Sequence, residues 1–172
     1  TWFDAFPSVE KLDSSPFFVE RSLMNAYQHT QPGTLIRVAL GGPMLVLLGV
    51  ILWAPLQPRV ELGIVAGILA ITLLLFHSLT VTIDDHFLRL NFGIGLIRIK
   101  YQVTQIAKAS SVKNKWYYGW GIRILWNGFL YNVSGLDAVE IVLSSGAVHR
   151  IGTDDPEGLT QAINAASHNR ST

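Results

Sequence analysis

The sequence predicts an α+β membrane protein, in which a hairpin of two transmembrane helices is followed by an antiparallel β-barrel or sandwich and a C-terminal helix. Three observations support this fold class. Only 15% of the 172 residues are charged, whereas a soluble domain has about 25%. Residues 38–79 contain only two charged residues, Arg59 and Glu61. After Leu79 the apolar residues change from a helical to an alternating period.

We expect three regions: an N-terminal arm at residues 1–34, a transmembrane hairpin at 35–79 and a cytoplasmic domain at 80–172. The arm is too interrupted by proline to form a domain and too aromatic to be a solvated tail. A short helix is predicted over Glu20–His29. Because the arm has no core of its own, we expect a partner protein to order it. Its candidate partner-binding residues are Trp2, Phe3, Phe6, Phe17 and Phe18.

Two apolar runs predict the helices of the hairpin. Val38–Leu56 is 19 residues without a charge, and Leu62–Leu79 is 18 such residues. A helix needs about 20 apolar residues to cross the hydrocarbon layer. The polar residues 57–61 between the runs are predicted as a connector, because Pro58 cannot continue a helix. The basic residues lie mainly outside the connector, which predicts that both termini are cytoplasmic.

The second run contains a GxxxG spacing, Gly63 and Gly67, which lets two helix backbones approach closely. Two interpretations remain open. The glycines form a docking face for another transmembrane subunit, or they let the hairpin pack against itself.

The remaining chain predicts short strands separated by turns, because its apolar residues alternate and Gly, Asn, Asp and Ser punctuate it. Residues 84–86 are predicted as the turn of the first β-hairpin. A cap and Pro156 predict a C-terminal helix starting within residues 153–157. The expected strands cover residues 80–83, 87–92, 96–101, 106–112, 121–126, 129–132, 138–143 and 148–151.

This order of strands and one final helix is that of a pleckstrin-homology-like (PH-like) barrel. Four segments carry a more specific likeness: Gly119–Arg123, Tyr131–Gly135, Ala138–Ile141 and Arg150–Glu157. They resemble the distal half of small bacterial membrane proteins with a PH-like domain. The resemblance implies the fold and the pattern of a transmembrane hairpin that leads into the first strand. The expected location is the bacterial inner (cytoplasmic) membrane. The resemblance implies little about activity, since one fold hosts many functions.

One departure from lipid-binding PH domains concerns the loop between the first two strands. Those domains carry Lys and Arg there for inositol phosphates, whereas this chain has Asp84, Asp85 and His86. We therefore expect no inositol-phosphate pocket at this loop.

The sequence offers little support for catalysis. The sequence has no cysteine, which excludes thiol catalysis, Cys-ligated zinc and iron–sulfur clusters. It contains no nucleophile elbow, phosphate-binding loop, zinc-protease motif or dinucleotide fingerprint. We expect a protein that is not an enzyme, with no metal site and no nucleic-acid partner.

His77 is the one candidate cofactor ligand, because an imidazole within an apolar run is costly and needs a partner. It either faces lipid head groups at the end of the second helix or ligates a pigment or haem. Apart from such a pigment or a bound lipid, no cofactor is expected.

A basic stretch follows the second helix, with seven basic and no acidic residues between His86 and Leu136. Such residues each gain about 1 kcal/mol near an anionic leaflet. They are either contacts to anionic lipid or ordinary positive-inside topology. The candidate membrane-surface residues are Arg89, Arg98, Lys100, Lys108, Lys113, Lys115 and Arg123.

The sequence therefore predicts a non-catalytic accessory, scaffold or assembly subunit of a multi-subunit bacterial membrane complex, with the PH-like domain as a protein-interaction module. Its partners would be other membrane subunits and lipids. Assembly proteins of bacterial photosynthetic complexes resemble this plan, so a photosynthetic or respiratory complex is the expected host. The alternative is a membrane-anchored module that binds anionic lipid head groups at the cytoplasmic surface.

Overall fold

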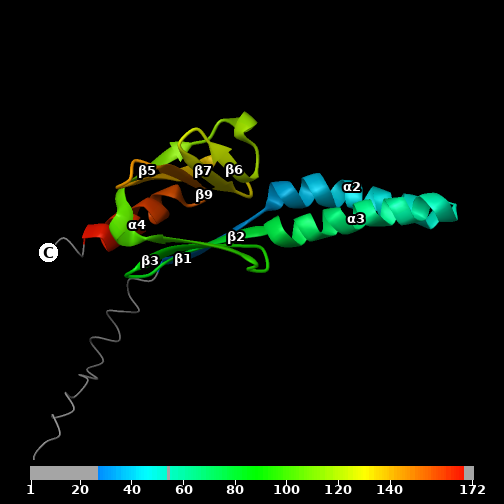
Figure 1. Ribbon diagram of the computed structural model, residues 1–172, viewed down its shortest axis with the longest axis horizontal. Helices are drawn as coiled ribbons and strands as arrows, with labels where there is room; N and C mark the ends of the chain where they lie inside the picture. The colour runs from blue at the N-terminus through cyan, green and yellow to red at the C-terminus, as the bar shows by residue number, and fades with distance from the viewer. Residues whose placement is uncertain (1–26, 54, 169–172) are drawn as a thin grey trace, which may run out of the picture.

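The computed structural model describes residues 27–53 and 55–168. Two β-sheets and a C-terminal helix form a domain, and a pair of long helices projects from one side of it (Figure 1). The predicted α+β class is confirmed at this level. The arm residues Trp2, Phe3, Phe6, Phe17 and Phe18 lie outside the described residues.

The two apolar runs form helices α2 (Thr34–Trp53) and α3 (Leu56–Phe76). Both are long and apolar enough to cross a membrane, since 20 residues span about 30 Å. The predicted connector is wrong, because residues 57–61 belong to the start of α3. Pro58 is the third residue of α3, and the first N–H groups of a helix have no partner within it. A proline therefore removes no hydrogen bond at this position.

The first sheet has the order β1-β2-β3-β4 and is antiparallel throughout. Its strand β1 precedes the helical pair, whereas β2 follows it. The predicted helix over Glu20–His29 is wrong at its end, because Tyr27–His29 open β1. Pairing with β2 gives these residues backbone partners that the local sequence does not reveal. The strands are β1 (Tyr27–Pro32), β2 (Ser78–Ile83), β3 (Phe87–Phe92) and β4 (Ile97–Gln102).

The second sheet has the order β5-β8-β9-β7-β6. It is mixed rather than antiparallel, because β7 and β9 run parallel. The two sheets are separate and are not closed into a barrel. All the expected strand segments are observed with small shifts in their ends. The strands are β5 (Ile106–Lys113), β6 (Gly121–Leu125), β7 (Gly128–Asn132), β8 (Asp137–Leu143) and β9 (Val148–Gly152).

The core follows from the alternation along the strands. Every second residue of β2 and β3 is buried, including Val81, Leu90 and Phe92, and these pack with buried residues of the second sheet. Helix α4 (Pro156–His168) adds Leu159 and Ile163 to this core. One apolar face on each element is therefore sufficient to build the domain.

Helix α4 begins as its sequence predicts. Pro156 is its first residue, and the backbone N–H of Gly158 donates to Oδ1 of Asp155 at 3.0 Å. Asp155 is therefore the residue that caps the helix.

Candidate functional site at the junction of helices and domain

The hairpin is clamped to the domain at one end. Pro32 of β1 pairs with Ser78 of β2, and the N–H of Gly33 donates to the carbonyl of His77 at 2.8 Å. A Cβ atom at Gly33 would lie 2.7 Å from the carbonyl oxygen of Phe76, so only glycine fits here. The start of α2 and the end of α3 therefore lie side by side, and the two helices leave and return on the domain side.

The predicted residue His77 and the basic residue Arg37 lie at this clamp. Arg37, one turn into α2, donates from Nε to the carbonyl of His77 at 3.2 Å. His77 caps the C-terminus of α3, with Nδ1 3.0 Å from the carbonyl oxygen of Leu74. The structure thus places His77 at the junction rather than within the helix. Its role as a pigment or haem ligand stays a prediction.

The β3–β4 turn packs against the last turn of α3. Gly93 has φ of 48°, and a Cβ atom there would lie 2.2 Å from the carbonyl oxygen of Leu74. The N–H of Gly93 donates to Ser78, and that of Gly95 to Phe92, both at 2.8 Å. Positive φ favours glycine at both positions, and the missing Cβ atom of Gly93 allows the turn to approach the helix closely.

The apolar side chains of this turn are uncovered. Ile94 is 57% exposed and Leu96 is 72% exposed. These two residues were not predicted to be functional, although two apolar residues that each follow a turn glycine, shortly after a long apolar run, were the available signal.

Three of the predicted basic residues come together on the outer face of the first sheet. Arg89 is opposite Lys100, and Arg98 is opposite Asn91 on the neighbouring strand. The guanidinium of Arg98 folds toward the turn, with Nε 2.6 Å from the carbonyl oxygen of Gly95. These residues line a shallow hollow that extends to the β3–β4 turn. A basic face therefore adjoins the junction.

Arg89 is also paired with an acid. It lies 2.8 Å from Asp84 at the opposite end of the sheet. Burial alone would raise the pKa of Asp84, but hydrogen bonds from the N–H groups of His86 and Phe87, together with Arg89, lower that pKa below its ordinary value. Part of the charge of Arg89 is thus neutralised locally.

The other four basic residues lie elsewhere. Lys108 and Lys113 belong to β5, the edge of the second sheet opposite β6. Lys115 precedes the short 3₁₀ helix η2 (Trp116–Tyr118), and Arg123 lies on β6. Lys113 is 3.9 Å from Asp137. The seven residues therefore do not form a single surface, because consecutive strands of this chain divide between two sheets.

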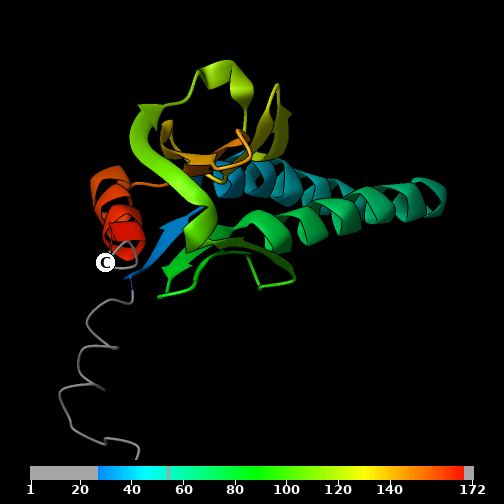
Figure 2. The same ribbon diagram turned by 60° about the vertical axis from the view of Figure 1, so that its left-hand side comes forward.

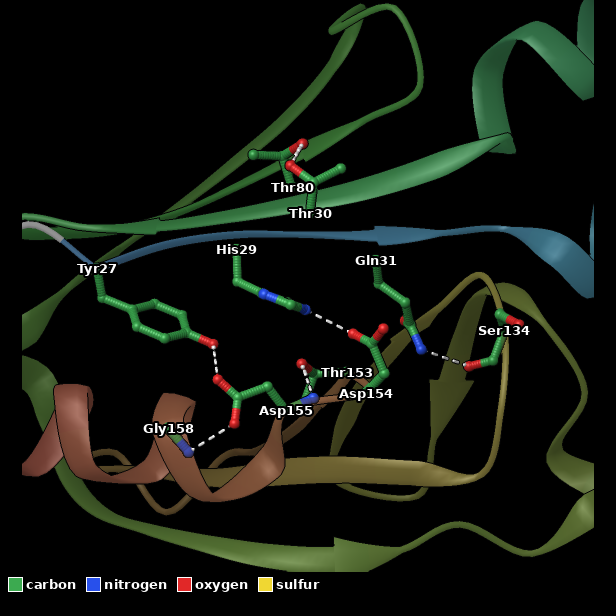
Figure 3. Close-up of polar contacts among 10 residues, drawn as sticks. All are labelled: Tyr27, His29, Thr30, Gln31, Thr80, Ser134, Thr153, Asp154, Asp155 and Gly158. Carbon is green, nitrogen blue, oxygen red and sulfur yellow. Dashed lines mark hydrogen bonds and ion pairs between the residues drawn. The ribbon is translucent and has the colours of Figure 1, made fainter.

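A second set of contacts, which was not predicted, fastens β1 to the loop between β7 and β8 and to the loop between β9 and α4 (Figure 3). Tyr27 donates to Asp155 at 3.0 Å, and Nε2 of His29 lies 2.5 Å from Oδ1 of Asp154. Gln31 donates to the carbonyl of Ser134 at 3.0 Å. Alternate residues of β1 thus point inward, and we call this set the polar clasp. In the sequence, only the spacing of two between these inward residues could have indicated the clasp.

The hydrogen bonds of the polar clasp hold β1 in place. Burial and the hydrogen bond to Asp155 raise the pKa of Tyr27, so the phenol stays protonated and donates. Within residues 27–53 and 55–168, no group of three or more His, Asp or Glu side chains could hold a metal ion.

The glycines of the predicted docking face are open. A Cβ atom at Gly63 or Gly67 would meet nothing within 4 Å, whereas Ala66 between them is buried. The hairpin therefore packs through another face of α3, and these glycines are uncovered in the described structure.

Comparison with known proteins adds no family assignment. No protein-family model matches the chain, and no curated protein matches it. The resemblance to small bacterial membrane proteins with a PH-like domain therefore stays a prediction from the sequence.

Proposed function

We propose that this chain is a non-catalytic accessory or assembly subunit of a multi-subunit bacterial membrane complex. In this proposal α2 and α3 cross the inner membrane, both termini are cytoplasmic, and the domain is a protein-interaction module. One observation carries it: a pair of apolar helices with almost no buried side chains is clamped to a folded domain at one end. A photosynthetic or respiratory complex is the host expected from the resemblance.

The exposure of the helices supports the membrane part of the proposal. Only 6% of each apolar window is buried, so neither helix is the core helix of the domain. Large apolar side chains such as Leu45, Val60 and Ile64 are exposed along both helices. In water this surface would be strongly unfavourable, whereas in hydrocarbon it is not.

The open glycines support a partner within the membrane. Helices associate in lipid through small residues that let backbones approach, and the hairpin leaves Gly63 and Gly67 uncovered. A second helix packed there would bury a surface that the chain does not use internally.

The test is co-purification after mild solubilisation of native membranes. We expect the wild-type chain to elute with a defined set of membrane subunits. The double variant Gly63→Leu and Gly67→Leu should lose this association while keeping its own fold, because its new side chains meet open space. Ile64→Leu with Ile68→Leu is the matched control, and it should keep the association. Elution of the wild-type chain alone would contradict the proposal.

The alternative is a module that binds anionic lipid head groups. The specific observation in its favour is the shared outer face of Arg89, Arg98 and Lys100 beside the junction. Phosphate groups on lipids would be attracted to this face, and salt would weaken the attraction.

Liposome binding by a domain without its hairpin would separate the two functions. A fragment from residue 80 onward is unsuitable, because it lacks β1 and the start of β2. Replacing residues 34–76 by a short Gly-Ser linker keeps both strands, since Gly33 and His77 are already hydrogen-bonded. Salt-sensitive binding to anionic vesicles, lost in Arg98→Gln with Lys100→Gln, would favour the lipid module. Absence of binding favours the accessory subunit.

A further inference from the structure

We infer that the β3–β4 turn and strand β6 contact the head-group region of the bilayer that α2 and α3 cross, so that lipid covers their exposed apolar side chains. We call these two elements, Gly93–Leu96 and Gly121–Leu125 with the adjoining Trp126, the collar. The inference rests on the proposed insertion of the hairpin. It assigns a surface, and a partner for that surface, that the helices alone do not define.

The depth of the β3–β4 turn relative to the bilayer follows from its contacts with α3. Gly93 lies against the carbonyl groups of Leu74 and Leu75, which belong to the last turn of α3. The 21 residues of α3 extend about 31 Å, close to the thickness of the hydrocarbon core. The last helical turn therefore reaches the interface, and so does the turn packed against it.

The chemistry of this turn fits that zone. Ile94 and Leu96 are exposed apolar side chains, and the exposed Arg98 folds back to the carbonyl of Gly95. An apolar tip flanked by a cation is the composition of segments that lie in an anionic interface. The turn is also held rigid by two backbone hydrogen bonds, so little conformational entropy is lost when lipid covers it.

The second part of the collar is strand β6 and the residue that follows it. Ile124 is 83% exposed and Trp126 is fully exposed. Tryptophan concentrates at membrane interfaces, where its ring is partly apolar and its N–H can be hydrated. Strand β6 is an edge strand, so its outer N–H and C=O groups need water or head groups. The wet interface satisfies both requirements, whereas the hydrocarbon core does not.

The two parts of the collar flank the helices. In Figure 1, β6 lies at the end of the second sheet nearest the start of α2, and the turn after β3 lies beneath the start of the projecting pair. Figure 2 shows the same arrangement from another direction, with the β6–β7 hairpin above α2 and the β3–β4 turn below α3. Contacts on both sides of the hairpin would fix the tilt of the domain on the membrane.

Single-cysteine labelling tests the collar without a background, because the chain has no cysteine. The full chain is reconstituted in vesicles containing anionic phospholipid, and each variant carries a polarity-sensitive fluorophore. Ile94→Cys and Ile124→Cys report on the collar. Asp85→Cys, in the exposed turn at the other end of the first sheet, is the aqueous control. Leu45→Cys, exposed on α2, is the hydrocarbon control.

We expect the labels at residues 94 and 124 to show blue-shifted emission, to be quenched by lipids that carry a spin label near the head group, and to resist quenching by iodide. The label at residue 85 should be quenched by iodide alone, and that at residue 45 by lipids labelled deep in the acyl chain. If residue 45 is in lipid but residues 94 and 124 are as open to iodide as residue 85, the collar is wrong and the hairpin stands.

Two other outcomes also decide the matter. Labels at residues 94 and 124 that resist both quenchers would show that protein covers the surface, which would overturn the lipid assignment. A label at residue 45 that lipid does not quench would instead contradict the insertion of the hairpin, and with it the proposed function.

Discussion

Two edge strands, β1 of the first sheet and β6 of the second, differ in whether their side chains contact the rest of the molecule. The inward side chains of β1 are joined to other elements by the polar clasp, and its outward residues, such as Gln28 and Thr30, are polar. Strand β6 instead exposes Ile122 and Ile124. The comparison indicates that β1 is fastened within the molecule, whereas β6 presents exposed apolar side chains, which we infer lipid covers.

The largest effect should come from breaking the turn that holds β6. Gly128 has φ of 154°, and a Cβ atom there would lie 1.8 Å from the carbonyl oxygen of Val148. Gly128→Ala should lower the free energy of unfolding by roughly 3 kcal/mol or more, through overpacking and backbone strain. Thermal or denaturant unfolding of the full chain in detergent measures this loss.

Gly121→Ala, at the other end of the same hairpin, is the matched control. Its φ is 96°, but a Cβ atom there would meet nothing within 4 Å. It should cost only about 1 kcal/mol from backbone strain. Equal losses for the two variants would show that contact with Val148 does not hold β6.

The next effect should come from opening the polar clasp. Gln31 is 4% exposed, and its amide donates to the carbonyl of Ser134. Gln31→Ala should cost about 2 kcal/mol, because it leaves a buried carbonyl without this donor. Gln28→Ala on the exposed face of the same strand should change the stability by less than about 0.5 kcal/mol. Comparable losses at the two positions would argue against the clasp as a fastener of β1.

A third prediction concerns the pH dependence of stability and His149 on β9, the strand that pairs with β7. The N–H of Phe129 donates to Nδ1 of His149 at 3.1 Å, and burial lowers the pKa of His149 below 6.5. The unfolded chain therefore binds this proton more readily than the folded chain does. The contribution to stability is complete above about pH 6.5 and falls as the pH decreases below that value.

His149→Asn provides the comparison, because its amide oxygen offers an acceptor near the position of Nδ1 without titrating. We expect denaturation midpoints measured from pH 7.5 to 5 to fall less steeply for this variant than for the wild type. Parallel curves would exclude His149 as a source of the acid sensitivity.

The smallest effect on stability is expected from a substitution on β6 itself, at the exposed Ile124. Ile124→Ser should change the free energy of unfolding in detergent by less than about 0.5 kcal/mol, since its side chain is already exposed. In vesicles the same change should shift the fluorescence of Trp126 to longer wavelength, if β6 lies in the interface. To isolate that signal, the other four tryptophans are replaced by phenylalanine. A large loss of stability in detergent would mean that Ile124 belongs to the core.

Local patterns predicted the elements that depend on neighbours in the sequence. The alternation of residues 87–92 predicted β3, because it reflects one exposed and one buried face. Pro156 predicted the start of α4, because proline suits the first turn of a helix, where its missing N–H costs no hydrogen bond. Strand β1 escaped prediction because its partner lies about 50 residues away: Thr30 pairs with Thr80. The start of α3 was misplaced because the sequence shows a proline but not its position within a helix.

The candidate site was predictable only in part. Arg98 and Lys100 could be placed together because they alternate on one strand. Lys108 could not be separated from them by sequence, because the chain leaves the first sheet at the short 3₁₀ helix η1 (Val103–Gln105) before entering β5. The collar depends on which turn packs against α3, and that contact is set by tertiary structure.

The position of β1 ahead of the helices and of β2 behind them constrains the order of assembly. Strand β1 cannot pair with β2 until residues 34–77 have left the domain and returned, because they lie between the two strands. Closing so long a loop in a disordered chain is entropically unfavourable, but pairing of α2 with α3 brings Gly33 and His77 together. Formation of the hairpin and completion of the first sheet are therefore coupled, and each favours the other.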